Sequence, residues 1–240
     1  MSDGVNIRQN MNKSKGGDAK ISVVIDAVKN SALKYISEQL TGTTAPVYCL
    51  GCGETDFSLP DVDVFYNDIN TPKLENTKKR VQLLNPKYFL KCDAIEVEPE
   101  ENAVAVCNFS LHEFALDKKG HLDEKRLSEY VGYLAENYDR ILIGEAGPGF
   151  LELFGDAHPY LEPEKLSEMF KEYGFDVVYK SITLSNDKET VLQSIPKIST
   201  FGGYMEDTYG MLIANNHLSK AQNTLKNDEI AYILDIKKLK

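Results

Sequence analysis

Two short apolar runs joined through a glycine turn constrain the fold of this chain more than any other feature. Val47–Leu50 is long enough for a buried strand but too short for a helix, and Gly51-Cys52-Gly53 follows at once. A second apolar run, residues 62–66, leads to Asp68. Two glycines after a buried strand favour a tight turn that a bound group can approach closely. An acid at the end of the next strand is where doubly wound sheets hold a ribose, so the stretch predicts the ligand-binding edge of a parallel sheet.

The remaining apolar runs alternate with segments of helical periodicity. We expect further strands at residues 88–91, 103–107, 140–144, 176–184 and 209–214, while the tail, residues 231–240, fits either a strand or a helix. We expect helices at residues 21–40, 71–83, 123–137 and 162–173. This alternation predicts a parallel sheet with helices on both faces, and right-handed crossovers bring the carboxyl ends of its strands to one edge. That edge would collect Gly51, Asp68, Asp93 and Asn108.

The stretches Leu50-Gly51-Cys52-Gly53 and Asn67-Asp68-Ile69-Asn70 resemble the signature of the class I S-adenosylmethionine-dependent methyltransferases, and the resemblance extends from Val47 to about Asn216. It implies an α/β fold with a doubly wound, mostly parallel seven-stranded sheet, helices on both faces and an antiparallel last strand. The chain departs from the signature at Thr55, which stands at the place of the third glycine. Only 17 positions separate Gly51 from Asp68, so the helix between them is expected to be short.

The same resemblance implies that S-adenosylmethionine is the cofactor. It places the two glycines beside the amino acid portion of the cofactor, Asp68 on both ribose hydroxyls and Asp93 on the adenine amino group. The segment after the fourth strand would line the methionine end and the transferring methyl. The expected cofactor-binding residues are Leu50, Gly51, Cys52, Gly53, Asp68, Ile69, Asp93, Ala94, Asn108 and Phe109.

His112 is the expected catalytic residue, because Leu111-His112 resembles the Leu-His that follows the fourth strand in many small-molecule methyltransferases. A histidine of near-neutral pKa can remove the proton that a hydroxyl or ammonium acceptor must lose. We do not pair it with Glu113, because neighbours in a helix do not share a face. A packing role for His112 stays open. Weaker candidates for substrate contacts are Glu145, His158, Tyr160 and Tyr204.

The charge and the length of the apolar runs narrow the possible partners. A formal net charge of −10 disfavours a large phosphate-binding surface, so we expect no nucleic-acid partner. No apolar run approaches the length of a membrane span, and the N-terminus lacks a secretory apolar core, so we expect a cytoplasmic protein without a membrane partner. We expect residues 1–20 to be disordered or loosely attached and residues 21–240 to form a single domain. The oligomeric state is not indicated.

Cys49-x-x-Cys52 is the one pattern typical of a metal or redox site. No second pair of cysteines or histidines exists to complete a zinc site, so we expect no metal. Together with Cys92 and Cys107, these cysteines lie at or near expected strand ends, where cysteine behaves as a small buried hydrophobe.

The predicted function is an enzyme, an S-adenosylmethionine-dependent methyltransferase that acts on a small-molecule acceptor. An NAD(P)-dependent oxidoreductase shares the glycines and the downstream acid, but Asp56 occupies the place of its third glycine. A nucleic-acid or protein methyltransferase is another alternative, although no Asn/Asp-Pro-Pro-Tyr-like base pocket follows the fourth strand. A non-catalytic relative that acts as a binding or scaffold partner also stays open.

Overall fold

The computed structural model of the chain describes residues 18–53, 59, 62–81, 88–149, 159–183 and 229–239, without the side chains of residues 18–27, 80 and 88. The described residues belong to two compact units. Residues 32–146, 159–181 and 232–239 form one unit, which carries most of the sheet and all of the candidate site. The other described stretches, residues 18–31, 147–149, 182–183 and 229–231, belong to the second unit.

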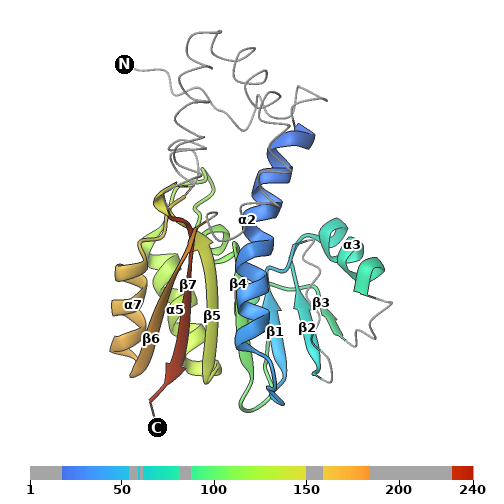
Figure 1. The fold of residues 1–240 in the computed structure, drawn as a ribbon. Helices are drawn as coiled ribbons and strands as arrows, with labels where there is room; N and C mark the ends of the chain where they lie inside the picture. Colours follow the sequence, from blue (N-terminus) through green and yellow to red (C-terminus); the bar gives the residue numbers. More distant parts are fainter. Residues whose placement is uncertain are drawn as a thin grey trace, which may run out of the picture. The chain divides into compact units, whose positions relative to one another are not determined.

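A seven-stranded sheet forms the centre of the described fold (Figure 1). Its strands are β1 (Val47–Leu50), β2 (Val64–Asn67), β3 (Tyr88–Leu90), β4 (Val104–Asn108), β5 (Arg140–Ala146), β6 (Phe175–Thr183) and β7 (Glu229–Lys238). Their order across the sheet is β3-β2-β1-β4-β5-β7-β6. The strands from β3 to β5 are parallel, and Cys49 of β1 pairs with Tyr66 of β2 and Val106 of β4.

The last strand, β7, runs antiparallel, as the class I methyltransferase fold requires. At its start the N–H of Gly147 donates to the carbonyl of Ile230, and at its end the N–H of Lys238 donates to the carbonyl of Asp139. The residue numbers of the partners therefore fall from 147 to 139 as those along β7 rise from 230 to 238, which is the pattern of an antiparallel pair. The predicted fold, a doubly wound and mostly parallel sheet with an antiparallel last strand, is confirmed.

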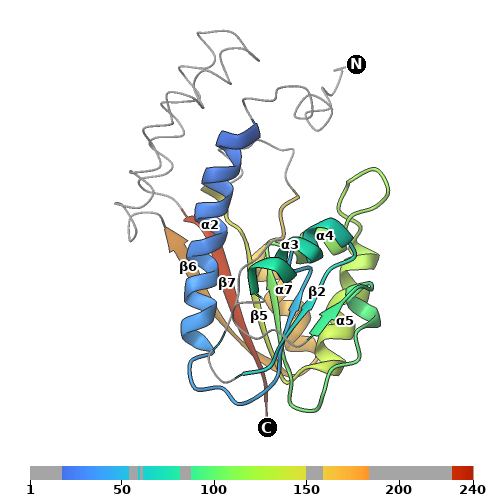
Figure 2. The same cartoon turned by 90° about the vertical axis from the view of Figure 1, so that its right-hand side faces the viewer.

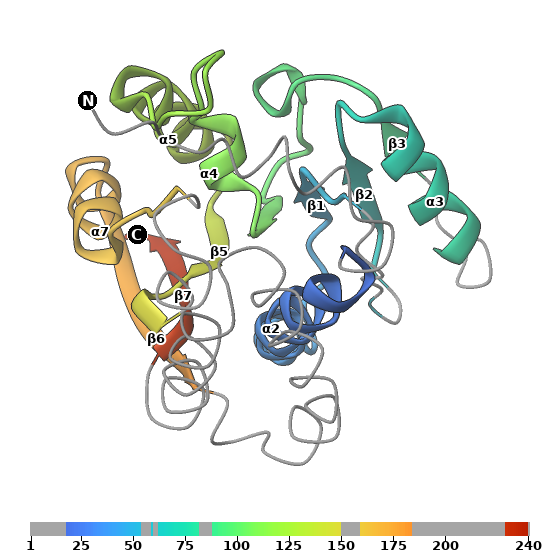
Figure 3. The ribbon, with the colours of Figure 1, turned by 90° about the horizontal axis from the view of Figure 1, so that it is seen from above.

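Helices cover both faces of the sheet. The described helices are α2 (Asp18–Gln39), α3 (Thr71–Val81), the 3-10 turn η2 (Ala94–Glu96), α4 (Leu111–Phe114), α5 (Glu124–Asn137) and α7 (Pro163–Glu172). Residues 32–39 of α2 lie on one face, with Ala32 and Ile36 3.5 Å from the position that a Cβ on Gly144 would take. Helices α4, α5 and α7 lie on the other face (Figures 2 and 3).

Local chemistry explains where α5 and α7 begin. The carboxylate of Asp123 accepts hydrogen bonds from the backbone N–H groups of Lys125 and Arg126, which satisfies donors that a helix start otherwise leaves without partners. Helix α7 starts with Pro163, whose fixed φ suits the first helical position. The inward faces of α5 and α7 join the fully buried strands in one apolar core that includes Leu127, Tyr130, Val131, Leu134, Leu166 and Phe170.

Some elements differ in extent from the sequence prediction, and one expected strand is not among the described residues. The expected strand at residues 209–214 lies outside the described residues, and the tail that was compatible with a strand or a helix is strand β7. Strand β5 extends two residues beyond its expected end at Gly144, so Glu145 lies inside a buried strand rather than in a loop. Residues 18–20 lie in the first turn of α2, and residues 1–17 lie outside the described part. None of the described helices is both long enough and apolar enough to cross a membrane.

Candidate functional site

The turn after β1 has the backbone geometry that the two glycines predict. Gly51 and Gly53 have φ values of 60° and 58°, which side chains of L-residues rarely adopt. A Cβ on Gly51 would lie 2.7 Å from the ring of Phe114 and 2.8 Å from the Cβ of Ser110, so α4 packs directly on this turn. The Ser110 hydroxyl also donates to the carbonyl of Leu50 at 2.8 Å. Among the described residues, a Cβ on Gly53 would meet no atom within 4 Å, so there the positive φ is what requires glycine.

Asp68 joins the glycine turn to the start of α3. Its Oδ2 accepts the N–H of Gly53 at 2.7 Å, and its Oδ1 accepts the N–H of Asn70 at 2.6 Å. The Thr77 hydroxyl holds the other side of the turn by donating to the carbonyl of Gly53 at 2.7 Å. Asp68 is nearly buried, but each carboxylate oxygen can accept more than one hydrogen bond. Asp68 can therefore close the turn and still accept a hydrogen bond from a ligand.

Asn67 was missed by the sequence prediction and connects three strand ends. Its Oδ1 lies 3.4 Å from the N–H of Gly51, and its Nδ2 donates to the carbonyls of Leu90 and Cys92 at 3.2 and 3.0 Å. The residue is buried, so its amide is satisfied entirely by the chain. The sequence signal for Asn67 was its position directly before Asp68, at the end of an expected strand. An amide side chain at such a position can form hydrogen bonds to the neighbouring loops.

Asp93 caps the η2 turn after β3. Its Oδ1 lies 3.4 Å from the N–H of Ile95 and also accepts a hydrogen bond from the hydroxyl of Tyr130. The N–H of Asp93 donates to the carboxylate of Glu96 at 3.2 Å, which completes a capping box around the predicted residue Ala94. Asp93 is thus fixed at the carboxyl end of β3.

Two exposed isoleucines follow the two acids. Ile69, an expected cofactor residue, is 72% exposed, and Ile95, which the sequence prediction missed, is 41% exposed. Each isoleucine therefore leaves an apolar side chain open to solvent directly after Asp68 or close after Asp93. The signal for Ile95 was its position next to Asp93-Ala94.

The chain bends sharply after β4. Phe109 has a φ of 55°, and its N–H donates to the carbonyl of Gly144 at 2.7 Å. A Cβ on Gly144 would lie 2.8 Å from Oδ1 of Asn108, so the glycine in β5 makes room for the Asn108 side chain. Both Asn108 and Phe109 are buried, and the bend starts α4 beside the glycine turn.

His112 and Glu145 form a buried pair between α4 and β5. The Nδ1 atom of His112 lies 2.6 Å from Oε2 of Glu145, and the N–H of His112 donates to Oε1 at 3.2 Å. The Nε2 atom lies 3.5 Å from Oε1 of Glu113, so the expectation that Glu113 and His112 do not pair is wrong. Helix α4 has only four residues, and the long Glu113 side chain reaches back to its neighbour.

These two carboxylates determine the charge of His112. Burial lowers the pKa of the imidazole, but the carboxylates of Glu145 and Glu113 raise it more strongly, to about 9. Because each ring nitrogen faces a carboxylate, both nitrogens act as donors in the imidazolium form. Near neutral pH the ring is therefore a charged donor rather than a free base.

Of the three remaining candidates for substrate contacts, one lies within the described residues. Tyr160 is partly buried, whereas His158 and Tyr204 lie outside the described residues.

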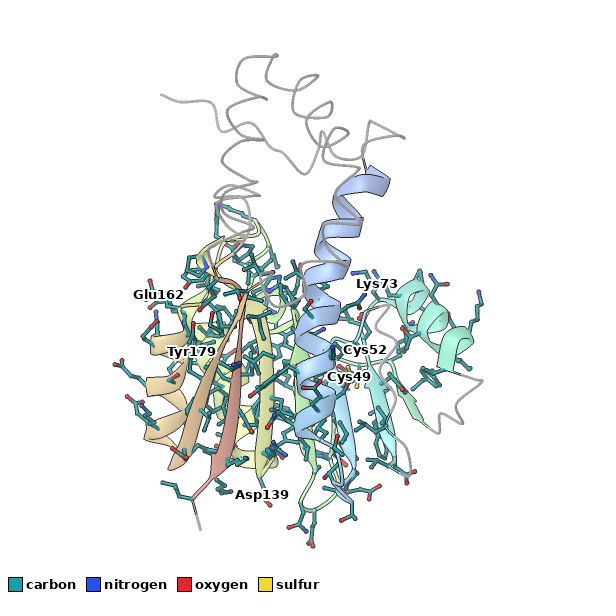
Figure 4. All side chains as sticks on the ribbon, in the orientation of Figure 1. Cys49, Cys52, Lys73, Asp139, Glu162 and Tyr179 are labelled. Carbon is teal, nitrogen blue, oxygen red and sulfur yellow. The ribbon has the colours of Figure 1, made fainter. Side chains whose placement is uncertain are left out.

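Burial raises the pKa of the Cys49, Cys52 and Cys107 thiols, which keeps them protonated. Figure 4 shows Cys49 on β1, Cys52 on the turn that follows and Lys73 at the start of α3. Within the described part of the chain, no three potential metal ligands cluster.

Comparison with solved structures relates this geometry to known proteins. Phosphoethanolamine N-methyltransferase 2 of Haemonchus contortus, in complex with phosphomonomethylethanolamine and S-adenosylhomocysteine, matches 88% of the chain with a TM-score of 0.56 and 16% identity. Magnesium protoporphyrin IX methyltransferase of Synechocystis PCC 6803, with bound SAM, matches 95% of the chain with a TM-score of 0.55 and 14% identity. This chain has the fold of these methyltransferases.

The matches also limit what the fold implies. The matched region covers 86% of the Synechocystis enzyme but 53% of the Haemonchus enzyme, so the chain spans about half the length of the latter. The cyclase SpnF matches 86% of the chain with a TM-score of 0.54 and 14% identity, so the same fold also serves a different reaction. No protein-family model matches the sequence, and no curated protein matches it significantly.

Proposed function

We propose that the protein is an S-adenosylmethionine-dependent methyltransferase that transfers a methyl group to a small-molecule acceptor. The observation that carries the proposal is the hydrogen bond from Gly53 to Asp68, which joins the left-handed glycine turn to the acid at the end of β2. This arrangement leaves backbone close to the ligand and an ionised acceptor beside it. The shared fold with enzymes that contain SAM or S-adenosylhomocysteine supports the same cofactor.

In this proposal the cofactor lies along the carboxyl ends of β1 to β4. Asp68 accepts hydrogen bonds from the ribose hydroxyls, and Asp93 accepts one from the adenine amino group. The exposed side chains of Ile69 and Ile95 contact the adenine ring. The remaining proposed cofactor contacts come from Leu50, Gly51, Cys52, Gly53, Ala94, Asn108 and Phe109.

His112 is proposed to act on the acceptor side of the transferring methyl. Methyl transfer requires an acceptor lone pair aligned with the sulfonium carbon, and holding that geometry supplies much of the rate. With a pKa of about 9, His112 is mostly protonated at pH 7. Glu145 holds its Nδ1–H, so an acceptor would receive a hydrogen bond from Nε2–H by taking the place of the exposed Glu113 carboxylate. Removal of an acceptor proton by the ring would dominate only at alkaline pH.

Calorimetry tests the cofactor half of the proposal. The protein is titrated with S-adenosylhomocysteine, S-adenosylmethionine and NAD, and we expect binding of the first two only. A preference for NAD, or no binding of either adenosyl ligand, would contradict the proposal. Release of S-adenosylhomocysteine with panels of amines, carboxylic acids, hydroxyl compounds and thiols then tests the transfer itself.

A non-catalytic binding protein is the second candidate. It is favoured by the burial of His112, whose side chain is only 3% exposed. Tight binding of S-adenosylhomocysteine without turnover of any acceptor class would favour this candidate. A gel shift at low salt separately tests the expectation that the protein binds no nucleic acid.

A further inference from the structure

Tyr130 of α5 donates the hydrogen bond that holds the Asp93 carboxylate. The two residues lie 37 positions apart, and Tyr130 is buried while Asp93 is only partly buried. Burial raises the pKa of the Tyr130 hydroxyl, and the hydrogen bond to Asp93 raises it further. The phenol therefore stays neutral and donates a hydrogen bond to the carboxylate at physiological pH.

Two donors converge on one oxygen of the Asp93 carboxylate. Oδ1 accepts the Tyr130 hydroxyl and lies 3.4 Å from the N–H of Ile95. The N–H of Asp93 is held by the Glu96 carboxylate at 3.2 Å, which fixes the backbone as well. Oδ2 can therefore still accept a hydrogen bond from a ligand.

The ring of Tyr130 also connects this acid to the glycine turn. It stacks on Phe114 with the ring centroids 5.0 Å apart, and the Phe114 ring packs on Gly51. The two aromatic rings therefore link the proposed adenine end of the site to the turn after β1. Replacing Tyr130 with phenylalanine would keep this packing and remove only the hydroxyl.

We propose that Tyr130 is a positioning residue that makes the site selective for a 6-aminopurine cofactor. This inference rests on the proposed function and goes beyond it, because it assigns the selectivity to a residue that does not contact the cofactor itself. The two donors on Oδ1 orient the carboxylate so that Oδ2 faces the purine. An ionised carboxylate only accepts hydrogen bonds, so it binds a 6-amino group and repels a 6-oxo group.

Competition between two purine ligands measures this selectivity. The probes are S-adenosylhomocysteine and S-inosylhomocysteine, which differ at the purine 6-position, and the readout is the ratio of their Kd values. We expect the wild-type chain to prefer the adenosyl ligand by ~100-fold or more, since a site built to accept a hydrogen bond rejects a ligand that lacks the donor. In Tyr130→Phe the carboxylate can rotate, and we expect this ratio to fall by ~10-fold.

Tyr133→Phe is the matched control. Tyr133 lies one turn further along α5, and its hydroxyl donates to the carbonyl of Val97 just beyond η2. This variant also loses a tyrosine hydroxyl from α5, but it keeps the hydrogen bond between Tyr130 and Asp93. Its selectivity ratio should equal that of the wild-type chain.

Asp93→Asn gives a second and independent test. The Tyr130 hydroxyl and the Ile95 N–H both donate toward the Oδ1 position, so they hold the amide oxygen there and place the amide NH₂ toward the purine. We expect the ratio to shift toward the inosyl ligand by at least ~100-fold. Adding Tyr130→Phe to this variant removes the orienting donor, and the shift should shrink.

The outcomes separate this inference from the proposed function. Binding of neither ligand by the wild-type chain would overturn both. Binding of S-adenosylhomocysteine with the same selectivity ratio in wild type and Tyr130→Phe would overturn the positioning role alone. If Tyr130→Phe does not fold, Tyr130→Leu, which also lacks the hydroxyl, takes its place, and a ratio equal to that of the wild-type chain overturns the positioning role.

Discussion

The Nδ1 atom of His112 lies 2.6 Å from Oε2 of Glu145, and both side chains are buried. A buried carboxylate needs a partner, and His112 supplies one. Its charged ring donates one hydrogen bond to Glu145, and its backbone N–H donates a second. The pair explains why a charged residue can occupy the end of a fully buried strand. It also gives His112 a charge state that its residue type alone does not predict.

Replacing Glu145 with glutamine should lower the pKa of His112 from about 9 toward its ordinary value. The amide oxygen can still accept the backbone N–H of His112, so the charge is removed while the fold of α4 is preserved. NMR titration of the histidine ring signals measures the change. The control is Asp117→Asn, which removes the acid beside the exposed His121 and should leave the His112 titration unchanged. A His112 pKa that stays near 9 in Glu145→Gln would contradict this account.

The raised pKa of His112 also predicts how stability depends on pH. A group whose pKa is higher in the folded state than in the unfolded state stabilises the fold below the unfolded value, about 6.5. That stabilisation is lost as the pH rises through about 9. The free energy of unfolding in urea should therefore fall between pH 6.5 and pH 9 in the wild-type chain, and fall less in Glu145→Gln. Equal slopes in the two proteins would argue against the pairing.

The two glycines of the turn after β1 should respond differently to alanine. Both have positive φ, so each substitution costs about 1–2 kcal/mol of backbone strain. Only at Gly51 would the new Cβ also collide with Phe114 and Ser110, which adds about 1–3 kcal/mol of overpacking. Urea denaturation should show a larger loss for Gly51→Ala than for Gly53→Ala, and Phe114→Leu should partly rescue the former. Equal losses would mean that α4 can move away from the turn.

Asp68→Ala should weaken cofactor binding by about 2–4 kcal/mol, because it removes the acceptor that we propose for both ribose hydroxyls. It should also cost about 1–3 kcal/mol of stability, since the N–H groups of Gly53 and Asn70 lose their acceptor. Asp117→Ala is the matched control, because Asp117 also accepts two backbone N–H groups but lies in a turn that contributes no proposed cofactor contact. Calorimetry should show normal affinity in the control. A folded Asp68→Ala protein that binds S-adenosylhomocysteine normally would remove Asp68 from the ribose site.

The elements that were predicted from sequence are those with a local signature. Strands β1 and β4 are short, wholly apolar runs, and α5 has an N-terminal aspartate and one apolar face. The glycine turn and the acids at the ends of β2 and β3 were predicted because strand order in a parallel sheet brings them to one edge. The positions of these elements can be predicted from the types of residues that lie close to one another in the sequence.

The features that were missed depend on partners far apart in the sequence. Glu145 was expected just after the fifth strand, at the start of a loop, and its partner His112 lies 33 positions away. Tyr130 showed only as an apolar position on α5, since nothing local indicates that its hydroxyl reaches Asp93. The tail, residues 231–240, was compatible with either a strand or a helix for the same reason. Asp235 interrupts its apolar pattern, and the acid can be buried there because it pairs with Arg140, 95 positions away, and with the nearby Lys237.

The pair of Arg140 and Asp235 should control the stability of the fold in acid. Arg140 donates through Nε and a terminal nitrogen to the two carboxylate oxygens at 2.9 and 2.8 Å, and it also donates to the carbonyl of Gln39 at the end of α2. Burial raises the pKa of Asp235, but the hydrogen bonds and charge of Arg140 outweigh it and lower the pKa overall. A carboxyl whose pKa is lower in the folded state stabilises the fold above its unfolded pKa, about 3.9, and loses this effect as the pH falls through the folded value.

Asp235→Asn should therefore lower the free energy of unfolding by about 2–4 kcal/mol at pH 7, because it leaves the largely buried Arg140 without its counter-charge. The difference from wild type should shrink as the pH falls below ~4, where the wild-type carboxylate also becomes protonated. Asp139→Asn is the matched control, since its pair with Lys238 lies at the same end of the sheet but is about half exposed and 3.8 Å apart, and it should change stability by less than about 0.5 kcal/mol. Urea denaturation of the three proteins at pH 7, 5 and 3 makes the comparison. A constant difference between wild type and Asp235→Asn across this range would show that packing of the aspartate, and not its charge, stabilises β7 against β5.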